Sequence, residues 1–106
     1  MAEPAAASFR FAPGTEGGLL AQGPLTFATA RAARLLGLAA LKDSPAVRQI
    51  DCAGVSACDS AGLAVLLDWL SAARLAGRSL VFTSLPQELV ALGRISDLDP
   101  LLARGV

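Results

Sequence analysis

Acidic, hydroxyl and thiol side chains gather in the middle of this 106-residue chain, around a run of small residues. Asp51 and Cys52 end one apolar segment, and Cys58, Asp59 and Ser60 precede a longer one. Two carboxylates can share general acid–base chemistry, but aspartates at strand ends more often form turns and caps. We therefore expect both aspartates to be structural rather than catalytic.

Several kinds of chemistry are missing from the sequence. The chain has no His, which removes the usual general base near neutral pH. It contains neither a Gly-x-Gly-x-x-Gly motif nor a phosphate-binding loop. Two Cys without His cannot complete a structural zinc site, and we expect both thiols to be reduced. The sequence thus predicts a non-enzymatic protein with no metal and no cofactor, which works by binding.

Charge and hydropathy exclude two classes of partner. The formal net charge is zero and the arginines are scattered at helical spacings, whereas a nucleic-acid binder carries a basic stripe. A membrane-spanning helix needs about 18 consecutive apolar residues, and no apolar run in the sequence approaches that length. The N-terminus lacks the pattern of a signal peptide. We expect a cytoplasmic protein with no nucleic-acid partner and no direct membrane insertion.

The groups named above must be positioned by one domain, because this length allows a single core. Residues 1–7 read as a flexible tail and residues 8–106 as the domain. Apolar alternation over 8–12, turn formers over 13–18 and a second apolar run over 19–22 predict an antiparallel hairpin.

A helix is predicted next. Residues 23–24, Gly-Pro, should end the second strand, and Thr26 is the expected N-cap of a helix over residues 27–42. Its apolar residues recur along one row: Ala28, Ala32, Leu35 and Ala39. Gly37 weakens such a helix by about 1 kcal/mol relative to Ala.

The second half of the chain alternates strands and helices. We expect a central strand over 47–52, a small-residue turn over 53–58, and a helix from Ser60 to about Ala76 that Gly77 ends. Two further elements follow, a strand over 79–83 and a helix that opens at 85–88. The order β-β-α-β-α-β-α predicts an α/β fold, a mixed sheet packed with helices through right-handed crossovers.

The helix that begins at Ser60 has two different sides. One side is broad and apolar, and we expect it to cover the sheet, with Trp69 partly exposed at its edge. The other side carries small and hydroxyl residues with one leucine among them: Ser60, Ala64, Leu67 and Ser71. Small residues on an exposed helix let another backbone come close, so this face is a candidate partner-binding surface; the competing explanation is that Ala is simply abundant here.

The start of the same helix carries a second signal. Ser60 is the expected N-cap, a role worth about 1 kcal/mol, and Asp59 favours the positive end of the helix dipole. Gly62 is costly in a first turn, which indicates that something approaches it closely. The cap and contact roles are compatible.

Together these segments resemble the STAS domain family, which includes cytoplasmic regions of sulfate transporters and anti-sigma factor antagonists. Residues 23–30 look like the family's segment entering the first helix. Residues 47–52 and 58–63, the latter ending Asp-Ser-Ala-Gly-Leu, look like its central strand and switch loop. The likeness runs from the hairpin to residues 98–102.

The resemblance leaves two functions open. In the anti-sigma antagonist branch the phosphorylated Ser stands immediately before the glycine, where this chain has Ala61, and an Asp often stands where it has Thr26. Both departures argue against a kinase-controlled switch, with Ser60 as the remaining candidate for phosphorylation. An anti-sigma factor antagonist that partner-switches with an anti-sigma kinase is therefore the alternative function.

The small STAS subunit of the Mla-type phospholipid ABC transporter, which lacks that Ser, is a better match. The resemblance implies binding to the cytoplasmic ATPase subunit, in a complex with a permease and a lipid-binding periplasmic subunit. That complex maintains lipid asymmetry of the Gram-negative outer membrane, which would place the protein peripherally at the inner membrane. By likeness the contact centres on Ser60 with Asp59, Ala61 and Gly62, and the helix face adds Ala64, Leu67 and Ser71.

Overall fold

The computed structural model of the chain describes residues 8–95. Along them run β1 (Arg10–Pro13), the 3-10 turn η2 (Thr15–Gly17), β2 (Leu19–Leu25), α1 (Ala30–Asp43), β3 (Gln49–Cys58), α2 (Ser60–Leu75), β4 (Val81–Thr83) and α3 (Gln87–Ile95). The predicted order of strands and α-helices is confirmed. The predicted tail over residues 1–7 and the C-terminal part of the domain lie outside the described residues.

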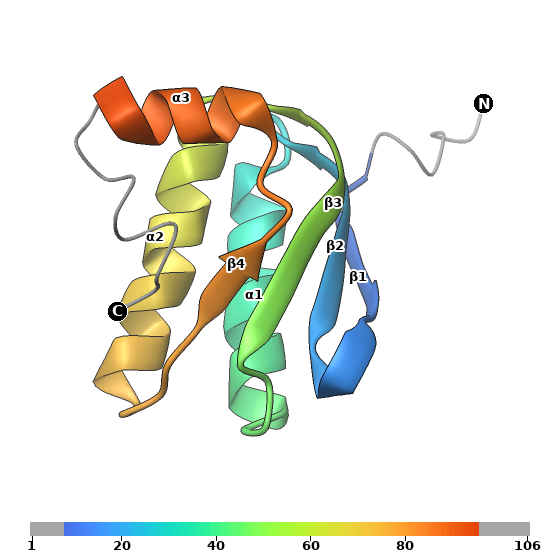
Figure 1. Cartoon of the computed structure of the whole chain (residues 1–106), viewed down its shortest axis with the longest axis vertical. Helices are drawn as coiled ribbons and strands as arrows, with labels where there is room; N and C mark the ends of the chain where they lie inside the picture. Colours follow the sequence, from blue (N-terminus) through green and yellow to red (C-terminus); the bar gives the residue numbers. More distant parts are fainter. Residues whose placement is uncertain (1–7, 96–106) are drawn as a thin grey trace.

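One mixed sheet carries the fold, with its strands in the order β1-β2-β3-β4. The predicted hairpin is confirmed: β1 pairs antiparallel with β2, and Ala12 lies opposite Leu20. β2, β3 and β4 pair parallel through the crossover helices α1 and α2. Because both crossovers move across the sheet in the same direction, α1 and α2 lie side by side on one face, while α3 lies across the end where α2 begins (Figure 1).

Both central strands are longer than predicted. β2 continues through Gly23 and Pro24 to Leu25, and β3 continues to Cys58, so the predicted strand end and the predicted turn over 53–58 are wrong. These segments pair with one another in parallel, with register shifts between Leu20 and Gln22 and between Gly23 and Pro24. A Cβ on Gly54 would stand 2.7 Å from a β2 carbonyl oxygen, which shows how close the two backbones run.

Helix α1 begins later than predicted and buries a different row. Thr26 is not its N-cap: the hydroxyl of Thr29 donates to the carbonyl of Pro24 (2.8 Å) and accepts from the N–H of Thr26 (3.0 Å), which closes a turn before the helix. The buried residues are Ala33, Gly37 and Leu41. The apolar row identified from the sequence, Ala28, Ala32, Leu35 and Ala39, faces solvent.

Trp69 of α2 explains this rotation of α1. Its side chain is fully buried beside Phe9, Phe11 and Phe82, at ring-centroid distances of 5.9, 5.4 and 6.4 Å, so the prediction of partial exposure is wrong. A Cβ on Gly37 would stand 2.0 Å from the indole nitrogen. The glycine is therefore the residue that admits the ring, and the apolar face of α1 turns toward the ring at that point.

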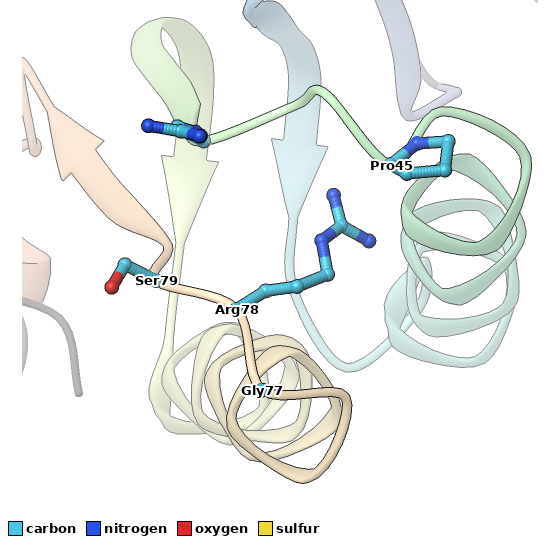
Figure 2. A pocket seen from close by; sticks show the side chains of 5 residues that line it. Pro45, Gly77, Arg78 and Ser79 are labelled. Carbon is cyan, nitrogen blue, oxygen red and sulfur yellow. The ribbon is translucent and has the colours of Figure 1, made fainter.

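The end of α2 follows the prediction. Gly77 has φ +70°, and the N–H groups of Gly77 and Arg78 donate to the carbonyls of Arg74 and Ala73 at 2.9 and 2.8 Å. From this turn the Arg78 side chain extends toward the loop that holds Pro45 (Figure 2). Its guanidinium donates to the carbonyls of Leu41, Ser44 and Val47 and so ties the ends of α1 and α2 together. Within residues 8–95, no helix has the length and apolar character needed to cross a membrane.

Candidate partner-binding site

Asp59 is the residue that organises the start of α2. One carboxylate oxygen accepts the N–H groups of Ala61 (2.9 Å) and Gly62 (3.1 Å), and the other accepts the N–H of Phe27 (3.0 Å). The prediction that Ser60 caps the helix is wrong, because a carboxylate at Asp59 already satisfies the first-turn donors. The bond from Phe27, together with those from Gly62 and Ala61, lowers the pKa of Asp59.

The bond to Phe27 joins two loops that are far apart in sequence. It fastens the turn between β2 and α1 to the turn between β3 and α2, across 32 positions of the chain. We call the surface formed by Phe27, Ser60 and Ala64 the docking corner. Its backbone is held by Asp59, which makes it a prearranged surface rather than two independent loops.

Ser60 is the first residue of α2, and its side chain is exposed. Within the described residues its hydroxyl makes no hydrogen bond, so it is available to another molecule. Ala64 and Ser71 are exposed along the same face, whereas Leu67 is half-buried and packs against the core. The helix face proposed from sequence is thus present as a smooth strip of small side chains, with Leu67 contributing mainly to the core.

Gly62 lies deeper than the rest of the predicted site, and Ala61 is half-buried. Gly62 is buried, and a Cβ there would stand 2.1 Å from the carbonyl oxygen of Leu25. The close approach indicated by the sequence is therefore made by the end of β2 in the same chain. This contact draws β2 against α2 and so helps to place Phe27 near Ser60.

Phe27 is the residue that sequence reasoning missed. The sequence pattern predicts that it belongs to the first helix, but it precedes α1 and is 84% exposed. Exposed aromatic side chains at a rigid corner are typical anchors of protein interfaces. The available signal was Thr29, whose hydroxyl closes the turn; recognising it would have placed Phe27 outside the helix.

The other chemical groups are not brought together. Asp51 accepts the N–H of Ala53 (2.9 Å) and stands eight positions before Asp59 along an extended strand, about 26 Å of chain at about 3.3 Å per residue. Cys52 and Cys58 are free thiols. Burial raises the pKa of Cys52 to about 12 and also raises that of Cys58. Residues 8–95 hold no group of three or more potential metal-binding side chains.

The comparisons with known proteins agree with this geometry. A family model described as "Mlab, STAS domain" matches residues 11–103. No curated protein matches the chain. Among solved structures it is similar to one described as "Structure of the Anti-Sigma Factor Antagonist SpoIIAA in its Unphosphorylated Form", with 15% sequence identity, 82% of each chain covered and a TM-score of 0.60, a likeness of fold. The chain belongs to the STAS domain family.

Proposed function

We propose that this protein is a non-enzymatic accessory subunit of a phospholipid-transport ABC transporter. It binds the cytoplasmic ATPase subunit, supports that subunit's assembly or activity, and resides at the inner membrane through the complex. The observation that carries the proposal is the match of residues 11–103 to the STAS family model whose description carries the Mlab name. STAS domains act through protein–protein contacts, and the docking corner offers a surface for one.

The docking corner has the properties of a small interface centre. The Phe27 ring is an exposed apolar anchor, and the exposed Ala64, one helical turn after Ser60, leaves room for a partner backbone. The free hydroxyl of Ser60 supplies one polar contact that fixes orientation. Asp59 holds all of this in place before binding, which lowers the entropy that association must overcome.

The alternative function, an anti-sigma factor antagonist, is favoured by the similarity of fold to SpoIIAA and by the exposed hydroxyl of Ser60. Two features weigh against it. The residue before Gly62 is Ala61, and a phosphate on Ser60 would lie beside the Asp59 carboxylate, which already occupies the N–H groups of Ala61 and Gly62. Like-charge repulsion would oppose the modification rather than favour it.

Binding to the purified ATPase subunit of a phospholipid-transport ABC transporter from the same organism tests the proposal. Phe27→Ala should weaken binding by about 2 kcal/mol, which is roughly thirtyfold in Kd. Ser60→Asp should also weaken it, because the new carboxylate is desolvated in the interface. Thr15→Asp is the matched control, since Thr15 is exposed in the turn between β1 and β2 and belongs to no surface that we propose to bind the partner.

The two functions give opposite results in a second measurement. Incubation with a candidate anti-sigma kinase and ATP should leave the intact mass unchanged if the transporter role is correct. If the kinase phosphorylates Ser60 and the unphosphorylated protein does not bind the ATPase subunit, the proposed function is wrong and the alternative is favoured.

A further inference from the structure

Helices α1 and α2 run in parallel with a constant register. Arg34 bonds Asp68 at 3.0 Å, and the indole N–H of Trp69 donates to the Arg34 carbonyl at 3.2 Å. Farther along, a hollow lies between the two helices, lined by Leu38, Leu41, Lys42, Ala72, Ala76 and Arg78. A residue of α1 therefore lies beside the residue 34 positions later on α2. The docking corner is at the N-terminal end of this pair, and the hollow is at the C-terminal end.

Four large apolar side chains of residues 8–94 are exposed, and three of them belong to α1 and α2. The four are Phe27, Leu35, Leu36 and Leu75, which are 84, 55, 44 and 87% exposed, and none of them belongs to a strand. At about 100° per residue, Leu35 lies on the side of α1 next to Leu38 and Lys42, which line the hollow, whereas Leu36 points away from α2. Leu75 is the last residue of α2, next to the hollow-lining Ala76.

The hollow is apolar inside and basic at its rim. Its volume is about 230 Å³, several times the roughly 30 Å³ of a water molecule, so one large apolar side chain fits. Lys42 and Arg78 stand at its edge, and Arg31 follows the same line of α1. Asp68 is neutralised by Arg34, and Asp43 lies about 100° away from Lys42 on the far side of α1.

We propose that this hollow is a second docking site, which receives an acidic amphipathic helix of the ATPase subunit. The helix inserts one large apolar side chain between Leu35 and Leu75 and sets carboxylates against Lys42 and Arg31. A third helix laid into the groove between two parallel helices is an ordinary packing arrangement. The inference rests on the proposed function, because it names the contact of the same partner.

Charge and shape favour this occupant over the other candidates. In a symmetric dimer the same patch meets itself, which would bring the basic rim of one copy against the basic rim of the other. A lipid surface is flat on this scale and does not enter a hollow between two helices. An acidic helix satisfies both the apolar interior and the basic rim.

Titration with the purified ATPase subunit tests the second site. Leu35→Glu and Leu75→Glu should each weaken binding at least about tenfold. Leu36→Glu, one residue along and facing away from α2, is the matched control and should bind as the wild type. Lys42→Glu should weaken binding and reduce its salt dependence, and Lys42→Arg should restore both.

The possible results separate this inference from the proposed function. No binding by the wild type refutes the proposed function and the second site with it. Binding that Phe27→Ala weakens but Leu35→Glu and Leu75→Glu leave unchanged refutes the second site alone. A second copy or a membrane would be the occupant if Leu35→Glu abolished self-association in sedimentation, or adsorption to anionic phosphatidylglycerol vesicles, without affecting the ATPase complex. The chain's own C-terminal segment would be the occupant if deleting residues 96–106 tightened that complex. Each of these results overturns the second site.

Discussion

Replacing Gly37 with Ala reverses the usual effect of that substitution in a helix. Ala at an interior helical position normally adds about 1 kcal/mol of stability relative to Gly. Here the added Cβ would lie 2.0 Å from Nε1 and 2.1 Å from Cε2 of Trp69. The ring is fully buried among three phenylalanine rings, so it cannot swing aside.

The size of the loss follows from the two contacts that must change. Overpacking a well-packed core costs about 1–3 kcal/mol. Moving the indole also removes its bond to the Arg34 carbonyl and leaves a buried donor unpaired, which costs about 1–3 kcal/mol. After the helix-propensity gain, we expect Gly37→Ala to lower the free energy of unfolding by about 3 kcal/mol. For a domain of this size, the midpoint of thermal unfolding should fall by more than about 10 °C.

Urea unfolding followed by circular dichroism measures this change. Ala39→Gly, at an exposed position of the same helix, is the control and should cost only the intrinsic penalty of about 1 kcal/mol. In a Trp69→Leu background the indole is absent, so Gly37→Ala should become neutral or stabilising, which a double-mutant cycle reports as coupling. If Gly37→Ala raised the stability of the otherwise wild-type protein, the proposed packing of Trp69 against Gly37 would be refuted.

Two more predictions concern the titratable groups near the central strand. Asp59→Ala should lower the midpoint of thermal unfolding at neutral pH, and the difference from the wild type should disappear as pH falls below 3.8, the ordinary pKa of this carboxyl. Folding lowers the pKa of Asp59, so its contribution to stability is complete above the ordinary pKa and is lost as pH falls through the pKa of the folded state. A difference that stays constant with pH would contradict this role. With a thiol reagent at about pH 8, Cys58 should react slowly and Cys52 should react only after unfolding. The reason is that Cys52 is buried and its pKa is raised to about 12. Equal reaction rates of the two thiols in the folded protein would contradict the burial of Cys52.

The element order was predictable because its signals are local. Turn formers mark the hairpin, and Gly77 ends α2 by a backbone conformation that its own neighbours demand. The errors arose where distant contacts decide. Nothing local in residues 53–58 shows that a parallel strand pairs with them, and the facing of α1 depends on a ring that lies 32 positions away from Gly37.

The candidate site divides in the same way. Its position at the start of α2 and the exposure of Ser60, Ala64 and Ser71 follow from helical periodicity. The sequence does not reveal Phe27, because its exposure depends on the turn that Thr29 closes and on the bond that its N–H donates to a carboxylate in another loop. A side chain that enters the site from a different segment carries no periodic signal.

Asp59 contributes both to the stability of the fold and to the conformation of the docking corner. Substitutions can therefore weaken partner binding in two ways that stability measurements distinguish. Its carboxylate holds the turn before α1 and the first turn of α2, so removing it loosens both loops and should lower stability and affinity together. Phe27 and Ser60 contribute no comparable bond through their side chains, so their variants should lower affinity at unchanged stability. If Phe27→Ala instead unfolded the domain as easily as Asp59→Ala, the exposed ring would be a packing residue, and the corner would lose its anchor.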